Sequence, residues 1–416
     1  MQKIKIGIIG FGTVGSAVDK LIKQNGTLIA DRIGVHFEVS AVADVSKKVH
    51  HPKLVRDAHK IINDPEISII VEAIGGVNPA LGYILSALKA GKHIVTSNKE
   101  VIALHGDKIF KEAEKNRCLV RFEGAVGGGI PIIGPLSSDL LANDLTEVFG
   151  IVNGTTNYIL SKMAKEGLEF AQALKEAQEL GFAEAKPQKD IEGYDASYKA
   201  VILASVAFGA KIDWKSVYFE GISKITQEDI RYADEIGYTI KLLAISKKSA
   251  GSLEVRVHPT LIPKDHPLAS VSGAMNAIYV TGNMVGELMF YGPGAGGAPT
   301  ASAIVGDIIA IVYPKFQMLK PHLKALTIKP INEILSRYYI RLTAPDRHGV
   351  LAGISKAFAD ENVSIAAVMQ KETIGKTATI VIIIHEAKEE NLRKAIAKLK
   401  KLPVVKEISN VIRVGL

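Results

Sequence analysis

The chain has 416 residues, of which 47% are hydrophobic and 23% charged. This length predicts two or three domains, and the composition excludes an extended disordered chain. The formal net charge of +8 is spread along the sequence without a block of like charges. We therefore expect a solvated surface rich in lysine and glutamate, and no nucleic-acid partner.

Cysteine content and hydropathy narrow the class further. The single cysteine, Cys118, excludes an intrachain disulfide framework and a cysteine-based metal cluster. No apolar run reaches the roughly 18 residues that are needed to cross a bilayer. Residues 1–12 lead directly into a strand, with no signal-peptide layout. We therefore expect a cytoplasmic protein that has no membrane contact.

The first part of the chain alternates between strands and helices. An apolar run at 4–9 ends in a glycine-rich turn at 10–15, and a helix is predicted over 16–24. The other predicted elements here are strands at 37–43, 67–73, 93–96 and 119–123, and a helix at 78–90. This alternation favours an α/β architecture with a parallel, doubly wound sheet.

The pattern changes after about residue 130. Helices are predicted at 131–141, 155–166, 170–180, 196–208 and 301–312, with strands at 146–152, 218–221, 238–246, 253–258, 276–281 and 287–291. This mixture predicts a second, α+β domain. Residues 313–336 hold three prolines and no clear period, which indicates a linker.

The last 80 residues or so predict a compact unit of their own. Strands are expected at 338–342, 363–371, 378–384 and 404–414, and helices at 349–361 and 389–400. Their βαββαβ order is that of the ferredoxin-like fold.

The glycine-rich turn has the context of a dinucleotide-binding motif, because a strand precedes it and a helix follows it. Gly10 permits the tight turn, Gly12 lets the backbone approach a pyrophosphate, and Gly15 allows close helix–sheet packing. The helix N-terminus then faces the phosphates. We expect a nicotinamide dinucleotide on the segment Gly10, Phe11, Gly12, Thr13, Val14 and Gly15. The alternative is a purely structural turn.

The choice between NAD and NADP depends on the end of the second strand. Asp44 can accept from the ribose hydroxyls, which favours NAD, whereas Lys47 and Lys48 could hold a 2′-phosphate. All three could instead be exposed loop residues. Ser97 and Lys99 follow the strand at 93–96, at the carboxyl edge where open sheets bind ligands, so a role beside the cofactor is expected.

A second charged constellation begins the apolar helix at 196–208. Asp195 and Lys199 are spaced i,i+4 and share one face of the first turn. An acidic side chain also suits a helix start. The alternative is a capped helix with a surface ion pair, which would contribute less than about 1 kcal/mol.

Taken together, the motifs resemble homoserine dehydrogenase over essentially the whole chain. They are, in order, GFGTVG, TSNKEVIA, FEGAVGGGIPII, NGTTNYIL, GFAEAKPQKDIEGYDASYKAVILA and GPGAGGAPTASA. The tail PDRHGVLAGISKAFADENVSI resembles an ACT domain. The resemblance implies a Rossmann domain at 1–130, a catalytic and dimerisation domain at 131–320, a linker at 321–337 and an ACT domain at 338–416. It also implies a homodimer or homotetramer.

The resemblance implies NAD(P)-dependent interconversion of L-aspartate 4-semialdehyde and L-homoserine, in the branch leading to threonine and methionine. Lys199 matches the catalytic lysine, Lys99 the lysine between nicotinamide and substrate, and Asp195 and Asp190 match carboxylates of the substrate pocket. Glu184 matches the residue that grips the substrate ammonium, and Gly297 matches a glycine that approaches the cofactor. A loop matching Glu123, Val126, Gly128 and Ile130 holds a monovalent cation, usually sodium.

In the tail, the segment from Asp346 to Val350, which includes Gly349, lies between the first strand and the first helix, where N–H groups at a helix start can bind a carboxylate. Asn362 lies at the start of the next strand, where it could meet the polar groups of an amino acid. The family role would be L-threonine feedback, and the alternative is a module that only dimerises. His348 stands where many such modules carry proline.

Two rival functions remain at this stage. Aspartate-semialdehyde dehydrogenase would need Cys118 as a nucleophile. A catalytically inactive amino-acid sensor would not need the charged residues Glu184, Asp190, Asp195, Lys199 and Lys99.

Overall fold

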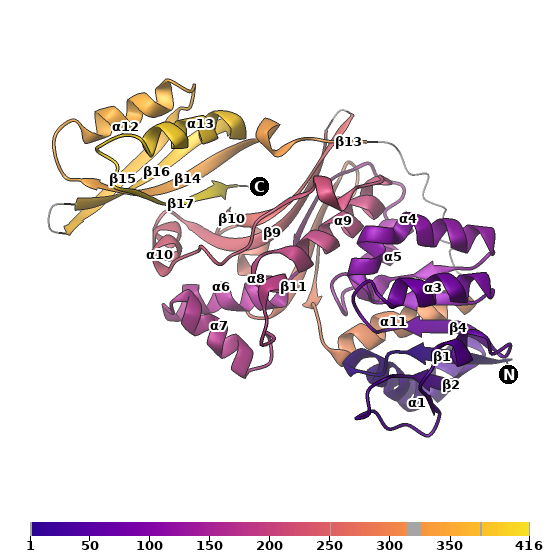
Figure 1. The fold of residues 1–416 in the computed structure, drawn as a ribbon. Helices are drawn as coiled ribbons and strands as arrows, with labels where there is room; N and C mark the ends of the chain where they lie inside the picture. The colour runs from indigo at the N-terminus through magenta and orange to yellow at the C-terminus, as the bar shows by residue number, and fades with distance from the viewer. Residues whose placement is uncertain (1, 250, 314–325, 375–376, 416) are drawn as a thin grey trace. The chain divides into compact units, whose positions relative to one another are not determined.

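The computed structural model describes residues 2–249, 251–313, 326–374 and 377–415 (Figure 1). The chain divides into two compact units, and each is assembled from separate stretches of sequence. The first unit takes the described residues of 1–154, 195–214 and 275–325, and the second takes those of 155–194, 215–274 and 326–416.

A parallel six-stranded sheet organises the first unit. Its strands lie in the order β3 (Leu54–Val55), β2 (Val35–Ala43), β1 (Gln2–Ile9), β4 (Ile67–Glu72), β5 (His93–Thr96) and β6 (Val120–Arg121). The order reverses between β1 and β4, which confirms the predicted doubly wound sheet. The inner strands are buried on both faces, so their sequences are nearly continuous apolar runs. This pattern can be recognised in the sequence.

Helices cover both faces of this sheet. The pair α1 (Thr13–Ile33) and α11 (Gly297–Val312) packs together on one face, and α2 (His59–Ile62), α3 (Ala80–Lys89) and α4 (Lys99–Lys115) follow one another on the other. The core of α1 and β1 includes the fully buried Ile304 and Ile308 of α11. Thus α11 shares a core with residues 4–42, although it lies almost 170 residues beyond the predicted domain limit at 130.

The rest of the first unit is a smaller α+β assembly. Strand β11 (Met275–Gly282) pairs antiparallel with both β7 (Leu145–Ile151) and β12 (Gly286–Pro293). The helical elements are η1 (Glu123–Ala125), α5 (Ile133–Ser137), α9 (Tyr194–Phe208) and η2 (Trp214–Ser216). The predicted helix over 131–141 is therefore much shorter than expected, and α9 matches its prediction closely.

The second unit contains a long hairpin and several helices. Strands β9 (Tyr238–Ser249) and β10 (Ser252–Pro263) pair over their whole length, and β8 (Tyr218–Phe219) and β13 (Thr327–Ile328) pair with β10. The helical elements are α6 (Gly154–Glu166), α7 (Phe170–Glu179), α8 (Gln188–Ile191), α10 (Gln227–Glu235) and η3 (Pro267–Ser270). Helix α10 was not predicted, although Thr226 and Asp229 form a capping box at its start.

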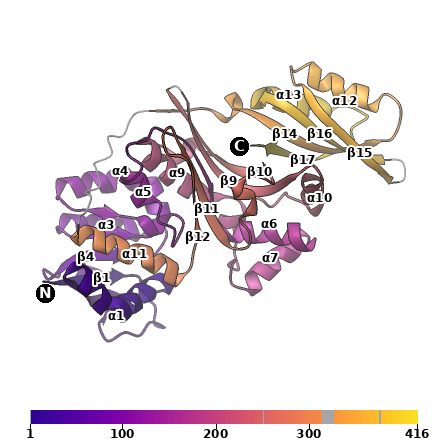
Figure 2. The same cartoon turned by 180° about the vertical axis from the view of Figure 1, so that it is seen from behind.

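The C-terminal part of the second unit has the predicted βαββαβ order. It comprises β14 (Leu335–Pro345), α12 (Val350–Ala359), β15 (Ile365–Ile374), β16 (Thr377–Lys388), α13 (Glu389–Leu399) and β17 (Glu407–Val414). Its antiparallel sheet has the order β17-β14-β16-β15, and both helices lie on one face in both views (Figures 1 and 2). This confirms the ferredoxin-like fold. Of the predicted linker 321–337, residues 321–325 lie outside the described residues, and the rest include β13, η4 (Ile331–Glu333) and the start of β14.

Buried charges join β14 to the start of α10. The Arg341 guanidinium donates to Asp229 at 2.7 Å and to the Thr226 hydroxyl at 2.9 Å, and it also pairs with Glu228. Arg341 is 5% exposed and Asp229 is fully buried. Such a pair is costly to break singly, because the remaining charge stays in a low-dielectric environment.

Lys241 of β9 is another buried charge, and its acceptors among the described residues are neutral. Its ammonium donates to the Asn157 side-chain oxygen at 3.1 Å and to the Val271 carbonyl, and the residue is 4% exposed. Burial lowers the pKa of Lys241 to about 8. The charged form is therefore disfavoured in the folded state.

This burial predicts a pH-dependent stability. Because the folded-state pKa of Lys241 lies below its unfolded value, the unfolded chain binds the proton more tightly, and the free energy of unfolding rises with pH from about 8. The group should contribute a rise of roughly 2 kcal/mol between about pH 8 and pH 10. Urea unfolding across this interval should show that rise in wild type and in Lys20→Met, an exposed control, and not in Lys241→Met. An equal rise in Lys241→Met would contradict the assignment.

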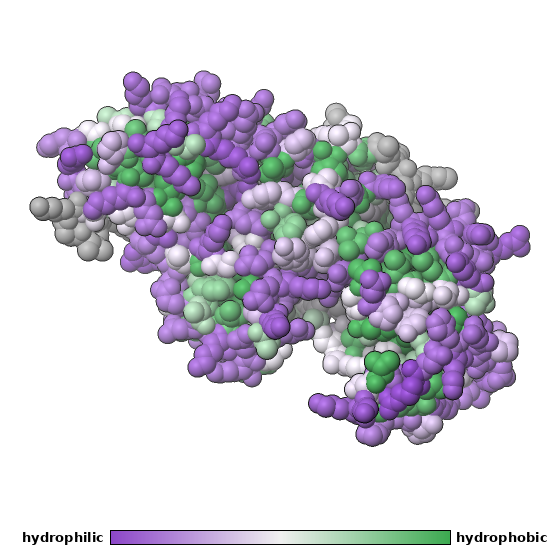
Figure 3. Space-filling model, in the orientation of Figure 1, coloured by the Kyte–Doolittle hydropathy of each residue, from purple (hydrophilic) through white to green (hydrophobic). Residues whose placement is uncertain are grey.

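The visible surface is mostly hydrophilic, with hydrophobic residues gathered in a few areas (Figure 3). Within the described residues, no helix combines the length and the apolar character that spanning a membrane requires.

Candidate active site

The glycine-rich turn lies at the carboxyl end of β1 and leads into α1. A Cβ on Gly10, where φ is +93°, would lie 2.6 Å from the Ala73 carbonyl oxygen, and one on Gly15 would lie 2.0 Å from the Gly10 carbonyl oxygen. A Cβ on Gly12 would meet nothing within 4 Å, so the space over the first turn of α1 is open. Unpaired N–H groups at this helix start fit a pyrophosphate, as the motif predicts.

Asp44 is tied into the same turn. One carboxylate oxygen accepts from the Phe11 N–H at 2.7 Å, and the other accepts from the Ser46 N–H at 2.8 Å. The exposed Arg56 donates to the carbonyls of Asp44 and Ser46 at 2.9 and 2.7 Å. Lys47 is exposed beside them. Arg56 was missed in the sequence because it lies 12 residues beyond Asp44, after a loop of no recognisable pattern.

Lys99 is the first residue of α4 and follows the carboxyl end of β5. Asn98 caps this helix by accepting from the Val101 N–H at 3.2 Å, while its amide donates to the Gly76 carbonyl at 2.7 Å. The Thr96 hydroxyl donates to the buried Glu72 at 2.6 Å. These bonds fix the start of α4 at the sheet edge, with Ser97 half-buried and the Lys99 side chain 43% exposed.

Asp195 brings both predicted lysines together. One of its carboxylate oxygens lies 2.6 Å from the Lys199 Nζ, and the other lies 3.2 Å from the Lys99 Nζ. Asn153, two residues after β7, donates to Asp195 at 2.9 Å, and Lys199 also donates to the Val152 carbonyl at 2.7 Å. The surface ion pair that the sequence left open is excluded, since Asp195 and Lys199 are only 7% and 8% exposed.

The electrostatics of the cluster favour an ionised Asp195. Burial alone would raise the pKa of its carboxyl group, but Lys199 and Lys99 and the hydrogen bonds from Lys199 and Asn153 lower it below the ordinary value. A carboxylate held in this way can orient two ammonium groups without taking their protons. Asn153 was missed in the sequence, although the NGTTNYIL motif contains it.

Glu184 and Asp190 belong to the second unit. Glu184 is exposed in the loop after α7, and its carbonyl accepts from the Gln178 side chain at 3.1 Å. Asp190 is half-buried in α8, and its carbonyl accepts from the Gly193 N–H at 3.0 Å.

The loop predicted to hold a cation runs through η1. The Glu123 carboxylate accepts from the N–H groups of Ile132, Ile133 and Gly134 at 2.6–2.8 Å, so it caps α5. Its own N–H donates at 2.8 Å to the buried Asp307 of α11, a contact that the sequence did not reveal. With the carboxylate occupied, the oxygens available to a cation in this loop are backbone carbonyls.

A neighbouring amide fits such a site. A Cβ on Gly128, where φ is +56°, would lie 2.6 Å from the Gly294 carbonyl group, and Gly294 packs directly on Asn276. Asn276 is fully buried, and among the described residues neither its amide nitrogen nor its oxygen has a hydrogen-bond partner. Val126 and Ile130 are buried in the same loop. Carbonyl oxygens in a glycine-rich cradle fit a hard cation.

Gly297 begins α11, and a Cβ there would lie 2.9 Å from the Thr13 carbonyl oxygen of α1. Only glycine permits this approach to the helix that follows the dinucleotide motif. Gly297 therefore lies beside Thr13, as a cofactor-approaching glycine would.

The tail residues frame α12. Gly349 is its N-cap with φ +84°, and Asp346 accepts from Gln370 at 3.1 Å. Asn362 is exposed, with φ +56°, and its N–H donates to the Ala359 carbonyl after the helix end. Asparagine tolerates this left-handed conformation, so a structural reason for it exists beside the predicted ligand contact.

Cys118 lies before β6 and is buried. Burial raises the pKa of its thiol, and the sulfur lies 3.4 Å from the Asn116 carbonyl oxygen. A buried thiol of raised pKa is a poor nucleophile, which argues against the thioester chemistry of the rival dehydrogenase.

A dinucleotide-binding turn and a buried lysine–carboxylate cluster in one unit define an NAD(P)-dependent oxidoreductase. Family models agree along the chain: the homoserine dehydrogenase NAD-binding domain matches residues 10–123, homoserine dehydrogenase matches 131–309, and the ACT domain matches 338–404. The chain belongs to the homoserine dehydrogenase family.

Similar proteins support this assignment. A homoserine dehydrogenase of Neisseria gonorrhoeae is 43% identical over 99% of both chains. A crystal structure of a homoserine dehydrogenase from Thiobacillus denitrificans has a TM-score of 0.95 and 41% identity, covering 100% of this chain and 98% of that one. A hyperthermophilic archaeal homoserine dehydrogenase in complex with NADPH has a TM-score of 0.66 and 31% identity, covering 77% of this chain and 100% of that one.

Proposed function

We propose that the chain interconverts L-aspartate 4-semialdehyde and L-homoserine, in the branch leading to threonine and methionine. The observation that carries the proposal is the cluster in which Asp195 holds the Nζ atoms of Lys199 and Lys99 at 2.6 and 3.2 Å. Reducing an aldehyde needs a hydride at carbon and a proton at oxygen. When bound, the nicotinamide supplies the hydride.

The chain's own residues supply the proton and the charge. In the reducing direction, the Lys199 ammonium gives a proton to the aldehyde oxygen as the oxygen gains negative charge, and in the oxidising direction the amine takes the hydroxyl proton back. Lys99 stabilises the same oxygen and lies on the cofactor side. Asp195 keeps both side chains in place and binds substrate. Glu184 and Asp190 hold the substrate, with Glu184 at its ammonium.

Assembly and location follow the family pattern. The chain forms a homodimer or homotetramer in the cytoplasm, through contacts in residues 131–320, with the cofactor on 1–130 and regulation by 338–416. A sodium ion on the carbonyls of Glu123, Val126, Gly128 and Ile130 stabilises the loop. The carboxylate of Glu123 has a separate role, because it caps α5.

The testing experiment is L-homoserine oxidation at alkaline pH, with NAD and NADP assayed separately and sodium present. Formation of the reduced nicotinamide with either cofactor supports the proposal. A folded protein that shows no turnover with either would restore the sensor hypothesis.

NAD is the proposed cofactor, although the archaeal relative was solved with NADPH. Asp44 keeps free lone pairs beside the turn and repels a 2′-phosphate, so NAD should give the higher kcat/KM. Asp44→Ala should lower the kcat/KM for NAD by about tenfold, because a charged hydrogen bond to the cofactor is lost. Lys60→Ala, which changes an exposed lysine of α2 that has no proposed role, is the control. If Asp44→Ala leaves the kcat/KM for NAD unchanged, the proposed role of Asp44 in cofactor binding is contradicted.

Threonine feedback is proposed for the ACT domain through Asp346, Gly349 and Asn362. We expect L-threonine to inhibit homoserine oxidation in the wild type, and Asn362→Ala to raise the inhibitory concentration by about tenfold while the uninhibited rate is unchanged. Asn362→Gly separates backbone from side chain, because it keeps the left-handed conformation. If threonine binds and Asn362→Ala binds it equally well, Asn362 has no part in the site.

A further inference from the structure

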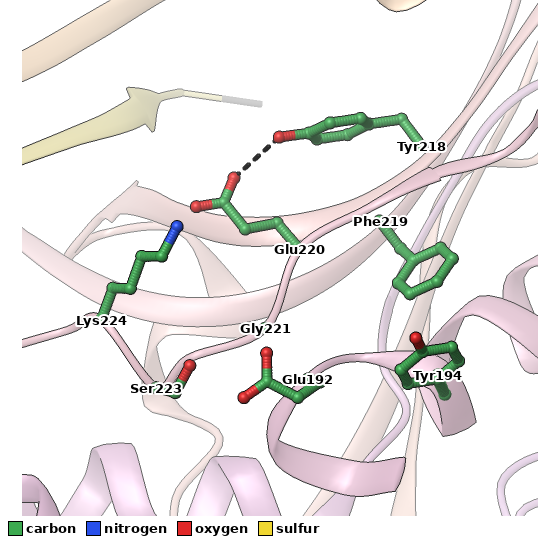
Figure 4. Close-up of a pocket in the computed structure, with 8 residues that line it drawn as sticks. All are labelled: Glu192, Tyr194, Tyr218, Phe219, Glu220, Gly221, Ser223 and Lys224. Atoms are coloured by element: carbon green, nitrogen blue, oxygen red, sulfur yellow. Dashed lines mark hydrogen bonds between the residues drawn. The ribbon is translucent and has the colours of Figure 1, made fainter. Parts of the chain in front are cut away.

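A cavity of about 410 Å³ lies in the second unit between the end of α8 and the segment around β8 (Figure 4). Its lining includes two carboxylates, three aromatic rings and one ammonium, supplied by Glu192, Glu220, Tyr194, Tyr218, Phe219 and Lys224. None of these side chains has a part in the proposed reaction.

Two of the lining charges are available to a ligand. Among the described residues, neither the Glu192 carboxylate nor the Lys224 ammonium makes an ion pair or hydrogen bond with another side chain. Glu192 is half-buried at the end of α8, Lys224 comes from the loop after β8, and no bond joins the two (Figure 4). One unpaired charge of each sign in a single cavity is the complement of a zwitterion.

The remaining lining is aromatic. The Tyr194 and Phe219 rings meet edge to face with centroids 4.7 Å apart, and the Tyr218 hydroxyl donates to Glu220 at 3.0 Å. That bond turns the Glu220 carboxylate toward Tyr218. The ring surfaces of Tyr194 and Phe219 can then contact an apolar group.

The two walls of the cavity are held together tightly. The Ile222 N–H donates to the Ile191 carbonyl at 2.7 Å, and a Cβ on Gly221 would lie 2.0 Å from that same oxygen. Gly193, with φ +86°, makes the turn between Glu192 and Tyr194. The cavity is therefore preformed, and one wall is the short stretch between Asp190 and Asp195 in the sequence.

We propose that this cavity binds a small α-amino acid with an apolar side chain. The ligand ammonium pairs with Glu192, its carboxylate pairs with Lys224, and its side chain lies on the rings of Tyr194 and Phe219. The site is separate from the ACT residues proposed for threonine, and the inference does not depend on them.

A neighbouring cavity of about 330 Å³ suggests what occupancy does. It shares Tyr218, Glu220 and Lys224 with the first cavity and is also lined by Glu389 and Arg413 of the ACT fold. Arg413 lies 3.5 Å from Glu220 and 5.0 Å from the Tyr218 ring centroid. A ligand that binds Glu192 and Lys224 therefore acts on the wall that the two cavities share and on the stretch before Asp195 together.

The test is calorimetric titration of the full chain with L-leucine and L-methionine, each beside its N-acetyl and amide derivatives. We expect at least one free amino acid to bind, with at least tenfold weaker binding of both of its derivatives, since each lacks one charge. Glu192→Gln and Lys224→Met should each weaken binding at least tenfold. Glu386→Gln, an exposed glutamate on β16, should leave it unchanged.

Three outcomes overturn the proposal. The first is that neither amino acid binds at millimolar concentration. The second is binding that Glu192→Gln and Lys224→Met leave unchanged. The third is binding that is lost in Asn362→Ala, or displaced by L-homoserine in direct competition, because the ligand then occupies the ACT site or the substrate site.

Discussion

Lys199→Ala will lower kcat for L-homoserine oxidation by about 10²–10⁴-fold, the contribution of a positioned acid–base group. Binding of NAD should be nearly unchanged, because the Lys199 ammonium bonds to Asp195 and the Val152 carbonyl and to no part of the dinucleotide turn. Stopped-flow turnover measures the first effect, and calorimetric titration with NAD measures the second.

The matched control is Lys211→Ala. It removes an exposed lysine that follows the end of α9 and pairs with Asp107 of α4. This variant should keep turnover within about twofold of wild type, because an exposed ion pair contributes little to stability. Wild-type turnover in Lys199→Ala would falsify the acid–base assignment. A loss of cofactor binding equal to the loss of turnover would instead assign Lys199 to the structure of the site.

Arg413→Met should cost about 3–5 kcal/mol of the free energy of unfolding. Arg413 of β17 is 5% exposed, pairs with both oxygens of Glu389 at 2.9 Å and lies over the Tyr218 and Tyr338 rings. Burial raises the pKa of Glu389, but the charge of Arg413 and the hydrogen bonds from Tyr338, Arg393 and Arg413 together keep the pKa below its usual range. Without Arg413, a buried carboxylate is left with the Tyr338 hydroxyl and the largely exposed Arg393.

Arg393→Met is the control, because it removes a second guanidinium from the same carboxylate at a site that is 51% exposed. It should cost less than about 1 kcal/mol. A double variant, Arg413→Met with Glu389→Met, should recover much of the lost stability, since no charge is then left unpaired. Hydrogen exchange should place the loss in β14 and β17. Equal costs for the two single variants would contradict a buried pair.

The features predicted from sequence were those with a local cause. The buried strands β1, β4 and β5 are apolar runs, and α9 follows from one continuous apolar segment. Helix α4 was not predicted, because the segment after the strand at 93–96 was interpreted only as a ligand-binding edge, whereas the Asn98 side chain is a helix cap. Helix α11 was predicted as a helix, but its evenly apolar sequence cannot say which core it joins, and that depends on its contact with α1.

The site shows the same division. The i,i+4 spacing predicted the pairing of Asp195 with Lys199, since helix geometry is local. Lys99 was expected only at a sheet edge, and its 3.2 Å approach to Asp195 depends on segments 96 residues apart. Asp307 had no local signature, and Asn153 was marked only by the NGTTNYIL motif, which gave it no role. Glu123 is the opposite case. The family resemblance marked this residue for a cation site, and the structure shows that its side chain also caps α5.

The return of α11 to the α1 face has a consequence for how the protein is made. Residue 121 ends the last strand of the parallel sheet, and 297–312 supplies the helix that completes its core. A ribosome adding about 5–20 residues per second needs roughly 10–40 s to cover that interval. During this time the apolar face of α1 is without its partner, so a nascent chain stalled before residue 297 should be a substrate for chaperones and proteases.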